Sequence, residues 1–274
     1  MSQLNMFGPA KPVKPFSGTL IYTPKGRARE YAALACNVYK GCDHKCTYCY
    51  APSATFKSRD EFTNPATRSN FLTKLEKEAA KHQAAGTTGR VLLSFTCDPY
   101  QHLDETEHVT RLAIEILHRY SLDVQVLTKG GSRALRDIDL FTPRDAFATT
   151  LTFLDLARSL HWEPNAATPP DRIETIKHFR ASGIPTWVSL EPVIDPNEAR
   201  AIICATHEFV DLFKVGKLNY HPHAQSIDWQ QFALDAIQLL TSLGYTRSTD
   251  HDNVRAGQFY IKRDLAAYLV NTPI

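Results

Sequence analysis

The sequence contains no long apolar run and no strong excess of charge. None of its stretches reaches the roughly 18 apolar residues that a membrane-spanning helix needs. The N-terminus has no charged start followed by an apolar core, so nothing there resembles a secretory signal. A net charge of +2 over 274 residues is too small to indicate nucleic-acid binding by itself. We therefore expect a cytoplasmic protein without a membrane partner.

Cysteine is scarce, and its distribution is uneven. Six cysteines in a chain of 274 residues are too few for a small disulfide-stapled scaffold. Three of them, Cys42, Cys46 and Cys49, follow a C-x3-C-x2-C spacing. Thiolates hold iron–sulfur clusters, and three ligands to a [4Fe–4S] cluster leave one iron open to a small molecule. The alternative is a zinc site completed by Cys36 and His44, although structural zinc usually uses two well-separated cysteine pairs.

The residues around these cysteines carry a family resemblance. An aromatic residue, Tyr48, stands directly before the third cysteine, and Tyr50-Ala51 follows it. This pattern resembles the radical S-adenosylmethionine (radical SAM) enzymes. The wider stretch 37–51 resembles their spore photoproduct lyase-like, "DNA repair photolyase", branch, over roughly residues 20–220. The resemblance implies a [4Fe–4S] cluster whose open iron is chelated by SAM, reductive cleavage of SAM to a 5′-deoxyadenosyl radical, and a flavodoxin or ferredoxin as electron donor.

Apolar strand-like segments alternate about six times with helical patterns. The predicted strands are 33–36, 90–97, 123–128, 146–153, 186–191 and 209–215. Predicted helices open near 64–66 and cover 105–120, 132–140, the region around 173–183, 197–205 and 227–243. Such alternation predicts right-handed βαβ units around a parallel sheet. Because a closed eightfold barrel takes about 250 residues, we predict an α/β fold with an open, partial (β/α)6 TIM-type barrel. The resemblance implies the same radical SAM fold.

The chain divides into three predicted parts. Residues 1–30 form a basic N-terminal extension, since residues 1–29 hold five lysines and arginines and no acid. This extension suits contact with phosphates, or it is a solvated tail. Residues 31–220 form the radical SAM barrel with its cluster, and 221–274 form a C-terminal helical extension packed on the barrel.

Polar residues gather where the predicted strands end. The chemistry of α/β barrels lies at the carboxyl ends of the strands, so we expect these residues to share one site beside the cysteine loop. The predicted cofactor-binding residues are Tyr48, Cys97, Asp98, Lys129, Thr150, Ser189 and Glu191. By resemblance, SAM contacts fall on Cys97, Lys129 and Thr150. Lys129 suits the SAM carboxylate, and Tyr48 suits its adenine. The alternatives are that Lys129 is a solvated lysine and that Thr150 is present for its β-propensity.

Cys97 is the predicted catalytic residue. In spore photoproduct lyase a strand cysteine returns a hydrogen atom to the substrate radical, and its register falls on Phe95 here. Residues 95 and 97 share a strand face, so Cys97 suits the same task. The alternative is a buried structural thiol.

The predicted function is that of a radical SAM enzyme, of lyase or transferase type, that abstracts hydrogen from a substrate. The resemblance favours a nucleic-acid base, to be repaired or modified. The alternatives are a protein or small-molecule substrate, or a non-enzymatic zinc or iron–sulfur protein.

Overall fold

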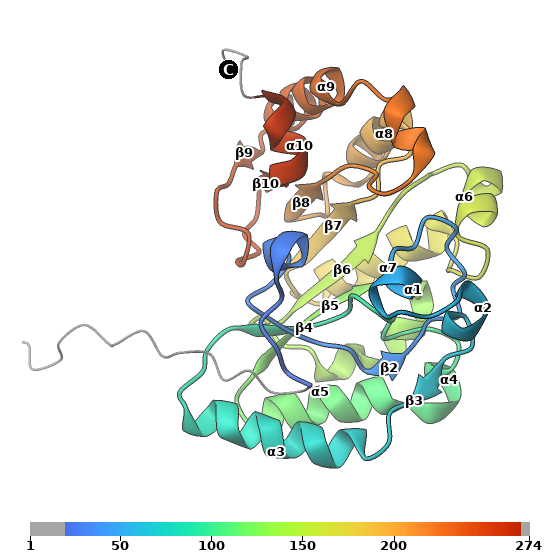
Figure 1. The fold of residues 1–274 in the computed structure, drawn as a ribbon. Helices are drawn as coiled ribbons and strands as arrows, with labels where there is room; N and C mark the ends of the chain where they lie inside the picture. The colour runs from blue at the N-terminus through green and yellow to red at the C-terminus, as the bar shows by residue number, and fades with distance from the viewer. Residues whose placement is uncertain (1–19, 270–274) are drawn as a thin grey trace, which may run out of the picture.

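The computed structural model describes residues 20–269, which form a curved parallel sheet with helices on its outer side (Figure 1). The strands of this sheet are β1 Leu34–Cys36, β4 Arg90–Leu93, β5 Asp123–Thr128, β6 Ala146–Thr150, β7 Thr186–Leu190, β8 Leu212–Val215, β9 Thr246–Arg247 and β10 Gln258–Ile261. Their order is β1-β4-β5-β6-β7-β8-β10-β9, and every neighbouring pair is parallel. The α/β partial barrel predicted from the sequence is the fold observed.

Helices connect the strands and cover the outside of the sheet (Figure 1). The longer ones are α3 Phe71–Ala84, α5 Val109–Arg119, η2 Gly131–Leu140, α7 Pro169–Ala181, α8 Pro196–Thr206 and α9 Trp229–Ser242. The shorter ones are η1 Gly26–Glu30, α1 Ala51–Ala54, α2 Arg59–Phe62, α4 Asp104–Glu107, α6 Leu156–Trp162, η3 Pro222–Ser226, α10 Arg263–Ala266 and η4 Ala267–Leu269. Two short strands, β2 Tyr39–Lys40 and β3 Ala66–Thr67, pair separately. Within residues 20–269, none of the helices combines the length and the apolarity needed to cross a membrane.

The sheet has eight strands rather than the predicted six because the C-terminal segment adds two. Gln258 of β10 lies opposite Leu212 of β8, and β9 pairs with the outer edge of β10. The sequence indicates the strand-like stretch 257–261 but not its place in the barrel sheet. The domain boundaries at residues 30 and 220 stay predictions. Most of the predicted basic extension, residues 1–19, lies outside the described residues.

Three smaller differences concern helices, and left-handed residues explain the first two. The helix predicted to open at 64–66 begins at Phe71, because Asn70 adopts a left-handed conformation (φ 55°) and residues 66–67 pair as β3. The predicted helix 105–120 is split at His108, which is also left-handed (φ 51°), into α4 and α5. Residues 131–140 form a 3-10 helix instead of an α-helix. Isolated left-handed residues interrupt helices because they cannot continue the right-handed path.

Side-chain alternation along the strands separates the barrel interior from the outer core. The interior is filled by a small set of residues: Tyr31, Ala32, Ala35, Leu92, Ala146, Ala148, Trp187 and Leu212. Residues of the other parity, such as Phe147 and Val188, pack under the helices. Because successive strand side chains point to opposite faces, the parity that buries Ala148 and Trp187 also places Thr150 and Ser189 on the inner face, at the carboxyl ends of their strands.

The N-terminal segment lies against the C-terminal one and covers part of the open side of the barrel (Figure 1). Glu30 of η1 accepts hydrogen bonds from the Tyr260 hydroxyl (2.9 Å) and the Arg263 amide (2.8 Å). Beneath it, the buried Lys214 ammonium donates to the carbonyls of Tyr31 (2.9 Å) and His251 (2.8 Å), and burial lowers its pKa to about 7. These contacts fix η1 next to β10, although more than 200 residues separate them in the chain.

Asp145 anchors the start of β6 to its neighbours. This fully buried carboxylate accepts the amides of Val124 (2.7 Å) and Thr142 (2.7 Å), and His118 Nε2 lies 3.0 Å away. Burial opposes its ionisation, but His118 and the two amides outweigh that effect, so the pKa of Asp145 lies below its usual range. The carboxylate is thus part of the register between β5 and β6.

We expect Asp145→Ala to lower the free energy of unfolding by about 3 kcal/mol, because two buried amides lose their acceptor. A carboxyl whose folded pKa is depressed stabilises the protein above its unfolded pKa of about 4. The difference between wild type and variant should therefore shrink as the pH falls through the folded pKa of Asp145. Urea denaturation across this pH range measures it. Asp139→Ala, at an exposed partner of Arg111, is the control; an equal loss in both variants would contradict the assignment.

Candidate functional site

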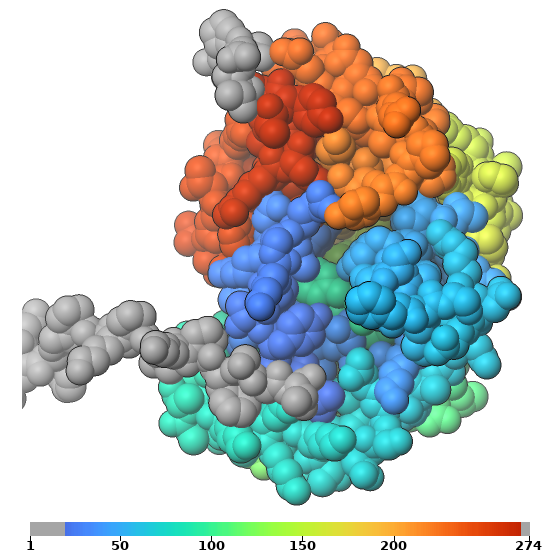
Figure 2. All heavy atoms as spheres, in the orientation of Figure 1, coloured from blue at the N-terminus to red at the C-terminus, as the bar shows by residue number. Residues whose placement is uncertain are grey.

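A cavity of about 390 Å³ opens at the carboxyl ends of the strands. Figure 2 shows a hollow on this face, between the blue segments of the N-terminal quarter and the orange segment near residue 220. All the residues predicted for the site line this cavity: Cys42, Cys46, Tyr48, Cys49, Cys97, Asp98, Lys129, Thr150, Ser189 and Glu191. The volume lies within the range of small-molecule pockets, about 300–1,000 Å³. The fold therefore brings the predicted residues together, while their individual roles stay predictions.

The cysteine loop between β2 and α1 is held in place by backbone hydrogen bonds. The Cys42 amide donates to the Phe62 carbonyl (2.9 Å), and the Thr47 amide donates to the Trp162 carbonyl (2.9 Å). Gly41, just before the loop, has φ +82°, and a Cβ there would lie 2.4 Å from the Phe62 carbonyl oxygen. Only glycine tolerates both the positive φ and the close approach, so Gly41 sets the point where the loop enters the cavity wall.

The donor set of this loop fits an iron–sulfur cluster. Cys42, Cys46 and Cys49 are free thiols on one cavity wall. Burial raises the pKa of all three, that of Cys46 to about 12, so their deprotonation calls for a bound cation, as metal coordination provides. Within residues 20–269, no group of three or more His, Cys, Asp or Glu side chains is arranged to hold a single metal ion. A cluster presents several irons, so its ligands need not converge on one point.

The two additional ligands of the zinc alternative are engaged elsewhere. Cys36 is buried in β1 as part of the outer core. His44 Nε2 lies 3.2 Å from Arg133, and its Nδ1 lies 3.5 Å from Asp98. Burial lowers the pKa of His44 to about 4, which leaves its ring neutral. The arrangement therefore favours three cysteine ligands over a set enlarged by Cys36 and His44.

Asp98 organises the strand ends beside the loop. Its carboxylate accepts the Thr128 hydroxyl (2.5 Å), the Lys129 amide (2.7 Å) and the Tyr100 amide (2.9 Å). Burial alone would raise its pKa, but His44 and these donors lower the pKa of Asp98 below its usual range. Asp98 therefore positions Lys129, whose side chain extends over the Tyr48 ring with Nζ 5.6 Å from the ring centroid.

A buried ion pair supports Tyr48 from behind. Glu163 accepts the Tyr48 hydroxyl and, at 3.0 Å, the Thr152 hydroxyl. Arg172 Nη2 lies 2.7 Å from the Glu163 carboxylate, and neither side chain is more than 1% exposed. Burial would raise the pKa of Glu163, but Arg172 and Lys129 lower it below the usual range. Arg172 is therefore the internal partner of Glu163.

Cys97 presents a protonated thiol to the cavity. It is 7% exposed, and its Sγ accepts the Tyr39 amide at 3.4 Å. Burial raises the pKa of Cys97 to about 12. β4 ends at Leu93, so Phe95 (φ 100°) and Cys97 lie beyond the strand, and the strand face predicted for them is wrong. Both residues nevertheless line the cavity. A thiol that keeps its proton at neutral pH retains the S–H bond that a hydrogen-atom donor requires.

The predicted cofactor-binding set includes only Ser189 and Glu191 on one side of the cavity. Ser189 Oγ lies 3.1 Å from the Tyr31 hydroxyl, and Glu191 accepts hydrogen bonds from both Tyr31 and Lys262. The cavity residues on this side that lie outside the predicted cofactor-binding set are Arg27, Tyr31, Tyr50, Lys217, Leu218, Asn219, Tyr220 and Lys262. Most come from η1, from the segment after β8 and from the end of β10. Lys217 and Asn219 follow the strand predicted at 209–215, and the basic residues near Arg27 are a weaker signal; no local motif marks the others.

Comparisons with known proteins agree with this architecture. The family model of the radical SAM superfamily matches residues 36–210. The uncharacterized protein MJ0683 of Methanocaldococcus jannaschii is 24% identical over 191 residues, 69% of this chain and 71% of that protein. The uncharacterized protein Rv2578c of Mycobacterium tuberculosis is 27% identical over 168 residues, which cover 58% of this chain and 48% of that protein.

Two solved structures share the fold at low identity. Streptococcus suis SuiB bound to S-adenosylmethionine superimposes with a TM-score of 0.62 and 12% identity, over 88% of this chain and 52% of SuiB. A spore photoproduct lyase mutant with bound AdoMet and dinucleoside spore photoproduct gives a TM-score of 0.63 and 13% identity, over 84% of this chain and 76% of the lyase. At these identities the likeness shows the partial-barrel fold alone.

We expect Glu163→Gln to lower the free energy of unfolding by about 3–5 kcal/mol, because the buried Arg172 charge loses its counterion. The double variant Glu163→Gln with Arg172→Met should recover most of that loss. Chemical denaturation of the wild type and both variants measures the coupling. If the single and double variants have equal free energies of unfolding, the charge of Arg172 is not coupled to Glu163, and the ion pair does not stabilise this part of the cavity wall.

Proposed function

The chain belongs to the radical SAM superfamily, and from this premise we propose that its cavity binds a [4Fe–4S] cluster and SAM to abstract hydrogen from a nucleic-acid base. The observation that carries the proposal is the common cavity: three free thiols from one loop face polar groups from the ends of the neighbouring strands. A protein or small molecule is the alternative substrate class, and a flavodoxin or ferredoxin is the proposed electron donor.

Cys42, Cys46 and Cys49 are the proposed cluster ligands. When bound, the cluster supplies the electron that cleaves SAM to a 5′-deoxyadenosyl radical. The contribution of the chain is to hold three thiolates on a loop fixed at Gly41 and braced by the Phe62 and Trp162 carbonyls. Burial also keeps water away from the site, which limits loss of a reactive radical to solvent.

Lys129 is the proposed partner of the SAM carboxylate. Among residues 20–269 no carboxylate lies within 4.0 Å of its Nζ atom, although the side chain is largely enclosed. Burial opposes its charge, but the nearby Cys46 and Glu163 raise the pKa of Lys129 above its usual range, so the ammonium persists. An unpaired cation beside the cysteine loop suits an anionic ligand group. Tyr48 and the Thr150 hydroxyl, on adjoining parts of the wall, are the proposed contacts of the adenine and ribose.

Asp98, Ser189 and Glu191 complete the proposed cofactor-binding set. Asp98 acts through the Lys129 backbone, whose amide it accepts at 2.7 Å. Ser189 and Glu191 are tied to Tyr31, so their polar atoms are held on the inner face of β7 and just beyond its end. Because these groups are already ordered, ligand binding does not cost the conformational entropy of fixing them, which raises affinity.

Cys97 is the proposed hydrogen-atom donor. In this step the S–H bond breaks homolytically, the hydrogen atom forms a C–H bond on the substrate radical, and a sulfur-centred radical remains on Cys97. One electron from the iron–sulfur or flavin donor protein and one proton restore the thiol. The raised pKa of Cys97 keeps the hydrogen in place before the step.

Exposed aromatic side chains near the mouth support a nucleic-acid substrate. Tyr220 is 82% exposed and Tyr50 47%, and both line the cavity. Phe56, 97% exposed, lies between α1 and α2, close in sequence to the cysteine loop. Solvent-exposed rings next to basic side chains are typical of surfaces on which bases stack. SuiB has been solved bound to its precursor peptide SuiA, so a peptide stays the alternative to be tested.

We expect Cys46→Ala to abolish both the cluster and SAM cleavage, because a single loop supplies all three thiolates. The test uses anaerobically reconstituted, dithionite-reduced protein, with EPR to detect the cluster and chromatography to detect 5′-deoxyadenosine. The matched control is Cys204→Ala, at an exposed cysteine of α8, which should behave as wild type. An unchanged EPR signal in Cys46→Ala would remove that residue from the ligand set.

We expect Lys129→Ala to retain the cluster and to bind SAM about 10- to 100-fold more weakly, as the loss of a buried charged contact costs roughly 1.5–3 kcal/mol. Titration of the reduced protein with SAM, followed through the change in its EPR spectrum, gives the affinity. Lys129→Arg, which keeps the charge, should recover part of it. If all three proteins bind SAM equally, Lys129 is not a SAM ligand.

A further inference from the structure

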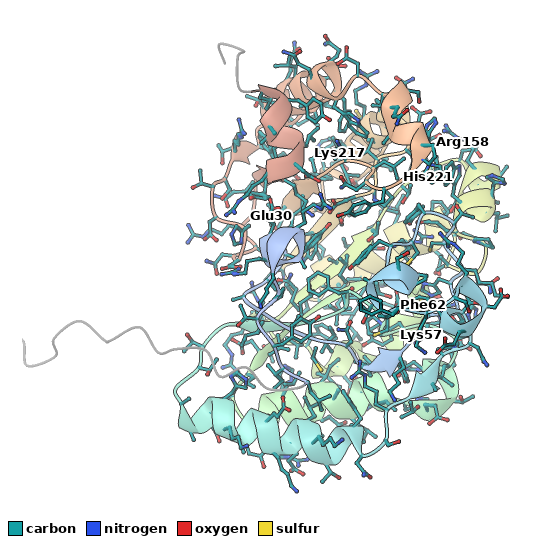
Figure 3. The ribbon with its side chains drawn as sticks, in the orientation of Figure 1. Glu30, Lys57, Phe62, Arg158, Lys217 and His221 are labelled. Atoms are coloured by element: carbon teal, nitrogen blue, oxygen red, sulfur yellow. The ribbon has the colours of Figure 1, made fainter. Side chains whose placement is uncertain are left out.

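The cavity has a basic wall on the side formed by the N- and C-terminal segments. We define it by four cavity-lining residues: Arg27 of η1, Lys217 and Tyr220 after β8, and Lys262 after β10. In Figure 1 these elements lie on one side of the mouth and α1 and α2, which follow the cysteine loop, on the other. Figure 3 likewise places Lys217 and Phe62 on opposite sides of the central opening, and both residues line the cavity.

Lys217 carries a positive charge that the described part of the chain does not neutralise. Its Nζ donates to the Tyr268 hydroxyl (2.8 Å) and lies 4.7 Å and 5.3 Å from the ring centroids of Tyr268 and Trp229. Within residues 20–269 no carboxylate comes within 4.0 Å of it. Two aromatic faces hold the ammonium in position without cancelling its charge. The charge thus remains available to an anion in the cavity.

Arg27 and Lys262 add to the positive potential of the wall. Arg27 stacks on the Tyr220 ring, 4.8 Å from its centroid, and its nearest carboxylate is that of Asp264 at 3.9 Å. Lys262 is paired with the cavity-lining Glu191. Of the charged residues that line this side, three are cations and one is a carboxylate. A cavity wall with such an excess concentrates anionic ligands.

Tyr220 makes the wall suited to a nucleotide rather than to a simple anion. Its ring is 82% exposed, one face is taken by the Arg27 guanidinium, and it lies in the same segment as Lys217. An aromatic platform next to basic side chains, here with the uncompensated Lys217, is the arrangement that binds single-stranded nucleic acids, with the bases on the rings and the phosphates on the cations. An acidic peptide would use the cations and leave the ring without a stacking partner.

We propose that Lys217 and Arg27 bind a backbone phosphate of a single-stranded nucleic acid and that Tyr220 stacks on a base next to it. This assignment rests on the nucleic-acid substrate proposed above. It directs the neighbouring nucleotide into the cavity, toward the cysteine loop and Cys97. The wall is a specificity device: it selects the substrate by its phosphate and its unstacked base, on the side of the cavity away from the proposed cluster ligands.

The test measures binding of a 5′-fluorescein-labelled ten-residue oligothymidylate to the reconstituted holoenzyme with SAM, by anisotropy at several NaCl concentrations. Each phosphate contact to a single strand contributes about 0.7 to the slope of log affinity against log salt. Lys217→Met should weaken binding about tenfold and reduce the slope by about 0.7, whereas Lys217→Arg should stay close to wild type. The matched control is Lys177→Met, at an ion-paired lysine of α7 outside the cavity lining, with no expected change.

Each alternative result has a distinct meaning. Equal affinity and slope in wild type and Lys217→Met overturn the phosphate site and leave the proposed function standing. A wild-type enzyme that forms 5′-deoxyadenosine but binds no oligothymidylate at 50 mM NaCl, roughly the low-salt end of such measurements, overturns the nucleic-acid substrate and the wall together. Displacement of the oligonucleotide by a polyglutamate peptide at equal charge overturns the assignment in favour of an acidic peptide.

A second variant, Arg27→Met, tests the proposal if Lys217→Met does not fold. If Lys217→Met loses the wild-type circular dichroism, Arg27→Met takes its place, because the Arg27 side chain is 39% exposed. It should weaken oligothymidylate binding in the same direction and lower the salt slope. Unchanged binding in a folded Arg27→Met protein overturns the proposal.

Discussion

The buried ion pair between Glu163 and Arg172 is the interaction on which the candidate site depends. Besides Tyr48, the network reaches the main chain: Arg172 donates to the carbonyl of Thr150 at 3.0 Å and to that of Ala167 at 2.7 Å. One pair therefore connects the cysteine loop, the end of β6 and the start of α7. A buried pair of this kind is favourable only when its remaining donors and acceptors are satisfied, which is why the surrounding hydroxyls and carbonyls converge on it.

The two walls of the cavity are built by different physical means. The cysteine side is held by short-range features. These are Gly41, where a Cβ would clash with the Phe62 carbonyl, and the backbone hydrogen bonds of a loop of a few residues. The opposite side is assembled from the two ends of the described chain, through Glu30 with Tyr260 and Arg29 with Asp252. Lys262 then joins it to Glu191, just after β7. The proposed chemistry lies between a locally encoded wall and one that depends on long-range contacts.

Much of the fold was predictable because parallel strands buried on both faces leave a strong apolar signal. Residues 90–93 and 186–190 are examples, and the alternation of strands and helices indicates the partial barrel. Boundaries were less predictable: single left-handed residues at Asn70 and His108 interrupt helices that periodicity alone continues. The short strand β10 joins the sheet by pairing with β8, and β9 pairs with β10; no local pattern specifies these pairings.

The sequence by itself determined the membership of the radical SAM superfamily. The motif spans eight consecutive positions and contains Cys42, Cys46, Tyr48 and Cys49. Chain connectivity therefore keeps these residues close together in any fold. Strand-end residues such as Lys129 could be placed because parallel strands end at one edge. Only the tertiary structure decided that Arg172 is neutralised internally and that Lys217 is not. It alone brought Arg27 and Tyr220, 193 residues apart, into contact, because such contacts follow from the packing of the whole sheet and leave no periodicity in the sequence.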